Sequence, residues 1–410
     1  MKGLYEKWCS INLILRIVVG LVIGTALALI IPNILFIEII GELFVGALKA
    51  IAPILVMVLV ISSLASSKGN VGNRMRTVVI LYLGTTLLAA AVSVVMSYLF
   101  PVHITLSIDP ADYASATLEE VLLNLVIGIV SNPVSAIINA NYLSILFWSV
   151  LFGFTIRKIG SPTVTNVMSE LSEIVSNIVR VIIQFAPIGL FGIIYTTVSA
   201  FGLSIFEEYA SLICLLVACM LIVMFVVSPL VSGILMRRNP FPLLFACLRG
   251  SAVTAFFTRS SAANIPMNMT LCEKLGLDRD FYSVSIPLGS AINMNGAAVT
   301  ITVMTLVGAF SIELDVPIVI AFALCFLATL AACGASGVSG GSLLLIPMAC
   351  SLLGISDDIA MQLVAIGFII GVIQDSLETA INSSNDVLYS ATAEVVDARK
   401  RGETLELNTD

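Results

Sequence analysis

Long apolar runs alternate with short polar segments along almost the whole chain. Because a bilayer-spanning helix needs about 20 residues, spans are expected near 11–31, 43–65, 77–100, 120–155, 165–200, 210–236, 282–309 and 358–390. The run at 120–155 is too long for one straight crossing and contains Asn132-Pro133 and the segment 139–141, so it should break into short helical pieces. The pattern predicts an all-α polytopic membrane protein with eight transmembrane helices.

Two further apolar segments, 241–272 and 316–353, are interrupted in their middle by small polar residues, at 258–264 and 334–342. Non-helical backbone at membrane depth is tolerated only where protein buries it or where it lines a cavity. Both segments are therefore predicted to be re-entrant helical hairpins, although ordinary double crossings fit the charge pattern equally well. The glycines at 334–341 could alternatively serve close helix packing, and no Gly-Lys-Ser/Thr follows them, which argues against a nucleotide loop.

The distribution of charge supports a membrane protein of defined orientation. Hydrophobic residues make up 59% of 410 and charged residues 11%, far below the quarter typical of soluble domains. Lysines and arginines follow the second, fourth, sixth and eighth spans, whereas the alternate loops are acidic, which places both termini in the cytoplasm. Lys2 and Lys7 precede the first run, which is expected to be a retained span. The single histidine, His103, and the absence of a Cys-x-x-Cys pair argue against a histidine or zinc centre.

A polar stretch, Asp375–Asp386, lies inside the last apolar run. Asp375, Thr379, Asn382 and Asp386 are spaced i, i+4, i+7 and i+11, so they share one helix face, with Glu378 beside it. Carboxylates at membrane depth must face a polar cavity or cations; the alternative is a solvated face on a helix that has left the membrane. No lysine or arginine lies between Arg279 and Arg399, so the nearest fixed partner would be Arg259, paired with Asp375 or Glu378.

The two hairpins carry groups that suit an anion and a small cation together. Serine hydroxyls and free helix N-terminal amides at the tips can bind a carboxylate. Unwound carbonyls there, and at 289–293 after Pro287, can coordinate sodium. A hairpin followed by a polar helix occurs twice, and such an inverted repeat with broken helices is typical of transporters that bind a substrate near the membrane midplane. A zwitterionic amino acid fits, with its ammonium group at Asp375.

Four motifs together resemble the dicarboxylate/amino acid:cation symporter family, which contains the glutamate transporter homologues. They are Arg259-Ser260-Ser261, Asn293-Met294-Asn295-Gly296, the glycine-rich tip at 337–341, and Asp375 with Thr379, Asn382 and Asp386. The likeness covers essentially the whole chain and is closest to the bacterial branch that imports serine and threonine with sodium. It implies an inner-membrane homotrimer and an elevator-type mechanism.

The resemblance also implies a division into parts. The scaffold would comprise 1–76 (helices 1–2) and 102–200 (helices 4–5). The transport domain would comprise 77–101 (helix 3), 201–240 (helix 6), 241–280 (hairpin 1), 281–312 (helix 7), 313–356 (hairpin 2, the extracellular gate) and 357–398 (helix 8), followed by a cytoplasmic tail at 399–410.

Site residues carried over from the family fall into a substrate set and sodium sets. The substrate set is Arg259, Ser260, Ser261, Val338, Asp375, Glu378, Thr379 and Asn382. A first sodium site would use Gly289, Asn293, Asn382 and Asp386; a second Ala291, Ala332, Cys333 and Ala335; a third Tyr82, Thr85, Thr86 and Asn295.

Departures from the family pattern bear on the substrate and on the number of ions. Members that take acidic substrates resemble one another in an arginine at the position of Glu378 and a threonine at that of Ala297. A carboxylate at 378 would repel an acidic side chain and could accept a hydrogen bond from a hydroxyl, which favours serine or threonine. Ser339 replaces a frequent proline, and Asn295 replaces an aspartate of the third sodium site, so the number of coupled sodium ions stays open.

Other functions remain as alternatives. Protons could drive a transporter of the same fold, carried by Glu378 or Asp386, and a channel is conceivable. An intramembrane aspartyl hydrolase would need two carboxylates about 3 Å apart, whereas Asp375 and Asp386 are about 16 Å apart along one helix. That geometry argues against an enzyme.

Overall fold

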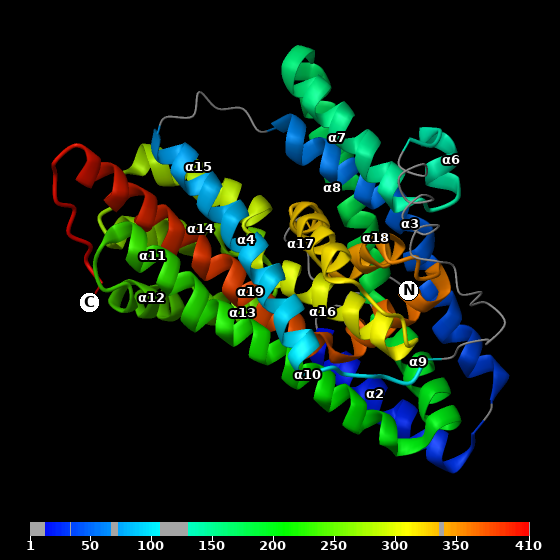
Figure 1. Ribbon diagram of the computed structural model, residues 1–410. Coiled ribbons are helices and arrows are strands. Elements are labelled where there is room, and N and C mark those ends of the chain that lie inside the picture. Colours follow the sequence, from blue (N-terminus) through cyan, green and yellow to red (C-terminus); the bar gives the residue numbers. More distant parts are fainter. Residues whose placement is uncertain (1–12, 33, 67–72, 107–129, 336–339, 410) are drawn as a thin grey trace, which may run out of the picture.

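The computed structural model describes residues 13–409 except 33, 67–72, 107–129 and 336–339. Every regular element in this part of the chain is a helix, and together they form an elongated, tilted bundle (Figure 1). Six of these helical stretches are long and apolar enough to cross a membrane. The protein is thus a multi-pass membrane protein, as the hydropathy pattern predicts.

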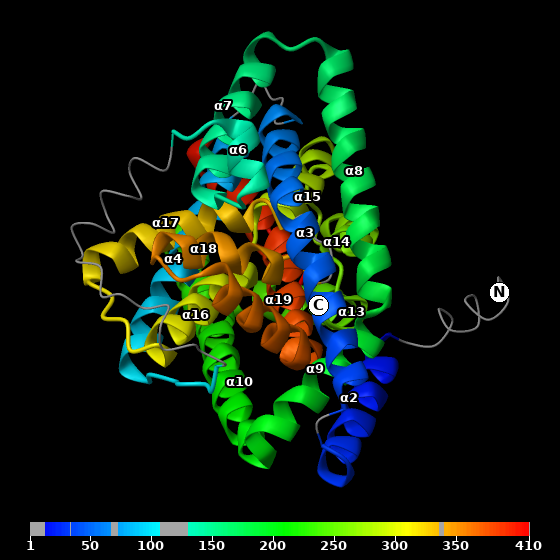
Figure 2. The ribbon, with the colours of Figure 1, turned by 90° about the vertical axis from the view of Figure 1, so that its right-hand side faces the viewer.

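One group of helices lies along one side of the molecule (Figure 2). It consists of α2 (Leu13–Ile30), α3 (Leu35–Ser66), α6 (Pro133–Ile138), α7 (Tyr142–Ile159), α8 (Pro162–Gln184) and α9 (Ala186–Phe201). Within it α3 packs against α7, α8 and α9, and α2 packs against α9. Arg16 Nη2 donates to Gln184 Oε1 at 2.8 Å, and the Tyr195 hydroxyl donates to the Ile31 carbonyl at 2.5 Å. These bonds connect helices that are far apart in the sequence.

The second group surrounds α19 (Asp357–Lys400), the longest helix. It contains α4 (Asn73–Leu99), α10 (Ile205–Ile222), α11 (Ser228–Met236), α12 (Phe241–Cys247), α13 (Val253–Thr258), α14 (Ser261–Lys274), α15 (Arg279–Ile292), α16 (Asn295–Ser311), α17 (Ile318–Ala332) and α18 (Ile346–Leu352). The six side chains of 387–392 have no exposed surface. Helix α19 is therefore the core of this group, and α4, α10, α14, α15 and α16 all pack on it.

One helix break lies where the sequence predicts it, inside 120–155, and a second divides the predicted span 165–200 into two helices. Asn132 and Asn141 accept hydrogen bonds from backbone N–H groups at the starts of α6 and α7, so the run at 120–155 is broken in its described part; residues 107–129 lie outside the described residues. Helix α8 ends at Gln184, just before Pro187 in the first turn of α9. A proline fits the first turn of a helix, where its missing N–H would have no intrahelical partner, so Pro187 favours a new helix beginning at Ala186.

The two segments predicted to be re-entrant hairpins, 241–272 and 316–353, each contain two helical arms in contact with each other. In the first, α12–α13 and α14 meet at Arg259 and Ser260; Arg259 has a left-handed φ of +50° that ends α13. In the second, α17 and α18 flank residues 333–345, of which 336–339, with Val338 and Ser339, lie outside the described residues. Gly340 has φ +74°, a conformation that favours glycine.

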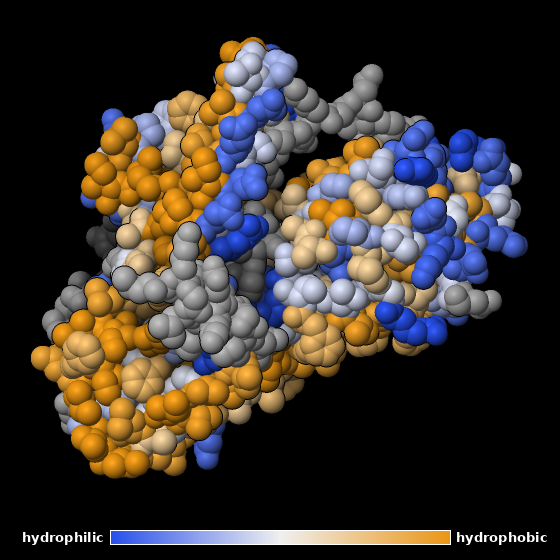
Figure 3. Space-filling model, turned by 180° about the vertical axis from the view of Figure 1, so that it is seen from behind, coloured by the Kyte–Doolittle hydropathy of each residue, from blue (hydrophilic) through white to orange (hydrophobic). Residues whose placement is uncertain are grey.

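Apolar side chains cover much of the outer surface (Figure 3). Large residues on α2 and α3, for example Val22, Ile30, Leu35 and Phe36, are 63–74% exposed. Hydrophilic residues gather at the end of the molecule that carries the C-terminal part of α19. This surface suits lipid around the bundle and water at its end.

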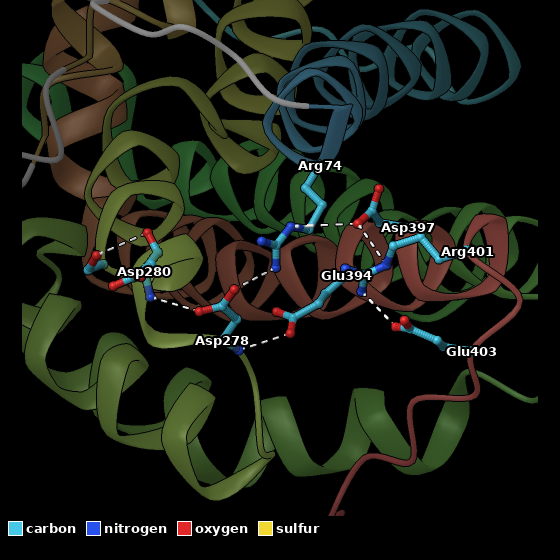
Figure 4. A network of polar contacts seen from close by, with 8 residues as sticks. Arg74, Asp278, Asp280, Glu394, Asp397, Arg401 and Glu403 are labelled. Atoms are coloured by element: carbon cyan, nitrogen blue, oxygen red, sulfur yellow. Dashed lines mark hydrogen bonds and ion pairs between the residues drawn. The ribbon is translucent and has the colours of Figure 1, made fainter.

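An ionic network joins three elements at that hydrophilic end (Figure 4). Arg74 on α4 lies 2.8 Å from Asp278, which precedes α15, and 3.7 Å from Asp397 on α19. The Asp278 N–H donates to Glu394 Oε1 at 2.9 Å. The hydrogen bond from the Arg74 guanidinium is the main cause that lowers the pKa of Asp278. The network thus holds the ends of α4, α15 and α19 together.

We expect Arg74→Gln to lower the thermal unfolding midpoint only slightly at neutral pH. The side chains of Arg74 and Asp278 are 29% and 39% exposed, so solvent screening limits the pair to about 1 kcal/mol or less. Because the pKa of Asp278 is lowered on folding, this contribution is present above the ordinary aspartate pKa and is lost as pH falls through the lowered value. Unfolding in detergent should therefore distinguish variant from parent at pH 7 but not in strong acid, with exposed Arg279→Gln as control.

Candidate site at the centre of helix α19

The polar face of α19 lies against the break between α15 and α16. Helix α15 ends at Ile292, Asn293 and Met294 have non-helical backbone, and α16 begins at Asn295. Asn293 Nδ2 donates to the Asn382 carbonyl at 3.1 Å and to Asp386 Oδ1 at 2.9 Å. The Gly296 N–H donates to Asn382 Oδ1 at 2.8 Å. The break thus presents polar groups to the buried face of α19.

Glycine is required at two positions of this contact. A Cβ on Gly289 would lie 2.6 Å from Asp386 Oδ1 and 2.9 Å from the Tyr82 hydroxyl. A Cβ on Gly296 would lie 2.7 Å from the Cα atom of Glu378. Real Cβ atoms do not approach so closely, so any other residue would push α15 or α16 away from α19. The two glycines allow the backbone of α15 and α16 to reach the carboxylates.

Two buried oxygen atoms beside the break have no hydrogen-bond donor among the described residues. They are Asp386 Oδ2 and Asn293 Oδ1, and both residues are completely buried. An unpaired carboxylate oxygen in a dry interior is costly unless a proton or a cation meets it. Together with backbone carbonyls near the break, these oxygens fit a small hard cation, because sodium prefers oxygen ligands.

The first hairpin contributes a cation to the same face. Arg259 Nε lies 3.2 Å from Asp375 Oδ2, and both side chains are less than a tenth exposed. Of the two pairings that the sequence leaves open, the structure has the one with Asp375. Ser260 caps α14 by accepting from the Ala263 N–H at 3.2 Å, and Ser261 is buried. The pair borders a cavity of about 20 Å³ that Ile17, Ile183 and Ala186 of the other helix group also line.

The first hairpin is also bound to α19 away from Asp375. Asn268 Nδ2 donates to the Ser383 carbonyl at 3.0 Å, and Asn264 Nδ2 donates to the Ser383 hydroxyl at 2.8 Å. Ser251, on the opposite arm, donates to Asn268 Oδ1 at 2.5 Å. All four residues are completely buried. This network therefore fixes both arms of the hairpin to α19.

The second hairpin contacts the two carboxylates at the start of the polar stretch. The Gly340 N–H donates to Asp375 Oδ1 at 3.2 Å, and the Ser342 hydroxyl donates to Glu378 Oε2 at 2.8 Å. Glu378 Oε2 also accepts from Thr300 Oγ1 at 2.7 Å and from Gln374 Nε2 at 2.5 Å. The sequence places Ser342 in the polar tip at 334–342 but does not pair it with Glu378, and Thr300 and Gln374 were not predicted. Gln374, four residues before Glu378, has a helical spacing that could have indicated the contact.

The remaining predicted residues fall into two neighbouring clusters. Thr86 Oγ1 donates to Asn295 Oδ1 at 3.0 Å, Thr85 lies 3.5 Å from the same oxygen, and the Tyr82 hydroxyl reaches the Asp386 carbonyl at 3.2 Å. Cys333 Sγ lies 3.7 Å from the Ile292 carbonyl, which brings the arm with Ala332 and Ala335 to the end of α15, near Ala291. Thr379 Oγ1 donates to the carbonyl of Asp375 in its own helix at 2.8 Å.

Buried carboxylates between two helical hairpins and a broken helix define a class of protein, the secondary transporters that bind solutes inside a membrane. Comparison with known proteins gives the family: residues 12–395 match the sodium:dicarboxylate symporter family. The chain belongs to this family, and it is therefore a transporter and not an enzyme.

Individual relatives are similar over nearly their full length. The chain is 52% identical to the serine/threonine transporter SstT of Bifidobacterium adolescentis over 99% of this chain and 94% of that protein. It is 49% identical to proteins of the same name from Streptococcus thermophilus, over 96% of this chain and 98% of that protein, and from Enterococcus faecalis, over 97% and 95%. The resemblance inferred from the motifs is thus confirmed at the level of the family.

Proposed function

We propose that the protein is a sodium-coupled symporter that imports serine and threonine. The observation that carries the proposal is the pair of donor-free buried oxygens on Asp386 and Asn293 at the helix break, a few turns from the Arg259–Asp375 ion pair. A cation and a zwitterion would thereby be bound close to each other. The sodium in the family's name and the substrates in the relatives' names support this assignment.

The first sodium ion, a co-transported substrate, would bind at the break between α15 and α16. Carbonyls of Gly289, Asn293 and Asn382 and the Asp386 carboxylate would be its ligands. The Asn293 amide orients Asp386 through Oδ1 and leaves Oδ2 for the ion. Ala291, Ala332, Cys333 and Ala335 would provide carbonyls for a second ion. The binding of two sodium ions by these groups would account for the small residues and the lack of positive charge at the break.

A third sodium site is weaker in this chain. Asn295 Oδ1 accepts hydrogen bonds from Thr85 and Thr86 of α4, and its Nδ2 donates to the Tyr389 hydroxyl at 3.3 Å. An amide there is neutral, whereas an aspartate would add a charge, so Tyr82, Thr85, Thr86 and Asn295 would hold an ion less tightly. We therefore propose that coupling rests on the first two sites.

The amino acid would bind between the hairpin tips and α19. Its ammonium group would bind the Asp375 carboxylate and would replace part of the contacts that Asp375 makes with Arg259 and Gly340. Its carboxylate would be met by Ser260, Ser261, Thr379 and Asn382 and by the backbone near Val338. Glu378 would accept a hydrogen bond from the side-chain hydroxyl and repel an acidic side chain.

The transport domain would move relative to the scaffold by an elevator-type mechanism. The scaffold would be 1–76 and 102–200, and the transport domain, with hairpin 2 at 313–356 as gate, would carry the site across. Eight crossings, two re-entrant hairpins, cytoplasmic termini and a homotrimer in the bacterial inner membrane complete the proposal. The small cavity at Asp375, lined from both helix groups, supports a boundary between two bodies at this point.

Uptake by proteoliposomes tests this function. Purified protein should accumulate labelled serine when an inward sodium gradient is imposed at fixed pH, and excess threonine should compete whereas glutamate should not. Uptake that ignores sodium and follows a proton gradient would instead support the proton-coupled alternative. If neither gradient drives uptake of serine or threonine, the proposed substrate class is wrong.

A further inference from the structure

Glu378 is held by three donors that come from three different elements. Thr300 lies on α16, Ser342 follows the tip of the second hairpin, and Gln374 lies one turn earlier on α19. All three meet the same atom, Oε2, at 2.5–2.8 Å. Thr300, Ser342 and Gln374 are at most 2% exposed. We call these three residues the Glu378 cradle.

The cradle leaves one carboxylate oxygen available. No donor from the described residues meets Oε1, and this atom is not among the fully buried polar atoms without a partner. An ionised carboxylate has room for about four hydrogen bonds and only accepts them. Three donors on one oxygen direct the remaining acceptor capacity of an ionised carboxylate to the second oxygen.

The two hairpins are attached to α19 in different ways. The first is fixed through Asn264, Asn268 and Ser383 and through the Arg259–Asp375 ion pair at its tip, and none of these contacts involves Glu378. The second donates, through Gly340 and Ser342, directly to Asp375 and Glu378. A displacement of the second hairpin would thus remove one of the three cradle bonds, whereas a displacement of the first would not.

We propose that Thr300, Ser342 and Gln374 are positioning residues that determine selection for a hydroxylated side chain. They hold Glu378 so that Oε1 accepts the hydrogen bond of the substrate hydroxyl. Ser342 donates its hydrogen bond to Glu378 only when the second hairpin lies against α19. The inference rests on the proposed serine and threonine transport. A site that hydrogen-bonds a substrate hydroxyl rejects the analogue without it far more strongly than an apolar pocket does. The analogue here is alanine.

The test is the ratio of alanine to serine concentrations that half-inhibit sodium-driven uptake of labelled threonine. Ser342→Ala, Thr300→Val and Gln374→Met each remove one donor at nearly constant volume. Because hydrogen bonds to charged groups are among the stronger ones, we expect each variant to lower the ratio about three- to tenfold. The concentration of sodium for half-maximal uptake should stay within about twofold in the same variants.

Matched controls separate positioning from general damage. Ser384→Ala and Thr392→Val remove buried hydroxyls that donate only to carbonyls of their own helix, so they should leave the ratio unchanged. If the cradle variants change inhibition by serine and by alanine equally, or change neither, the inference is overturned. If the parent protein takes up serine with sodium but does not discriminate against alanine, the inference is also overturned. Failure of the parent to take up serine would instead overturn the proposed function.

Hydrogen exchange tests the link to the second hairpin. In the presence of sodium, serine should protect the amides of 340–345 more than alanine does, and Ser342→Ala should abolish that difference. Peptides from 261–274 of the first hairpin serve as an internal reference, since their polar attachment to Ser383 does not involve Glu378. Equal protection by serine and alanine in the parent would contradict the proposed role of Ser342.

Discussion

Replacement of Asp375 by asparagine should reduce sodium-driven serine uptake more than about 100-fold. The carboxylate pairs with Arg259 at 3.2 Å and accepts from the Gly340 N–H at 3.2 Å, and it is 4% exposed. Removing one partner of a buried ion pair costs about 3–5 kcal/mol because the other charge is left unpaired. Each 1.4 kcal/mol is a tenfold change in an equilibrium constant, and the substrate ammonium group loses its acceptor as well. Uptake by proteoliposomes at saturating sodium measures the effect.

Asp280→Asn is the matched control for this prediction. Asp280 is an exposed aspartate in the first turn of α15, at the hydrophilic end of the molecule. The same chemical change there should leave uptake within about twofold. Asp375→Asn that retains more than a tenth of the parental uptake would show that the substrate ammonium group does not bind at Asp375.

Replacement of Asp386 by asparagine should raise the sodium concentration for half-maximal uptake about tenfold or more. Asp386 is completely buried, its Oδ1 accepts from Asn293, and its Oδ2 has no donor among the described residues. An amide has no net charge to balance a cation, and losing a bond to a charged group costs about 1.5–3 kcal/mol, or roughly 10- to 100-fold. The measurement is serine uptake as a function of sodium at constant ionic strength.

Asp358→Asn provides the comparison, since Asp358 is exposed in the first turn of α19. Its sodium dependence should match that of the parent. The two aspartates of the site should also differ from each other: Asp386→Asn should recover uptake at high sodium, whereas Asp375→Asn should not. An unchanged sodium dependence in Asp386→Asn would remove Asp386 from the proposed ion site.

Local sequence spacing was sufficient to predict the face of α19. Residues 375, 379, 382 and 386 lie on one side because a helix has 3.6 residues per turn, and this helix is continuous through all of them. The breaks at 293–294 and at the first tip were predictable because Asn, Gly and Ser clusters inside apolar runs oppose a continuous helix. Membership of the family follows from these same motifs.

Contacts between distant segments were not predictable in the same way. Arg259 could pair with Asp375 or Glu378, and only the folded arrangement selects Asp375. The donors on Glu378 from α16 and from the second hairpin, and the attachment of Asn264 and Asn268 to Ser383, join residues 36–119 positions apart. No helical or strand period links such positions, so a single sequence contains no local signal for them.

The central place of α19 has a consequence for biosynthesis. Chains are made and inserted from the N-terminus, so α4, α14, α15 and α16 enter the membrane before the helix on which they pack. Until that helix arrives, Asn264, Asn268 and Asn293 lack the partners that α19 provides in the finished protein. Unsatisfied amides in hydrocarbon are costly. The half-built bundle must therefore keep these groups in contact with water or with the insertion machinery until the last span is released from the ribosome.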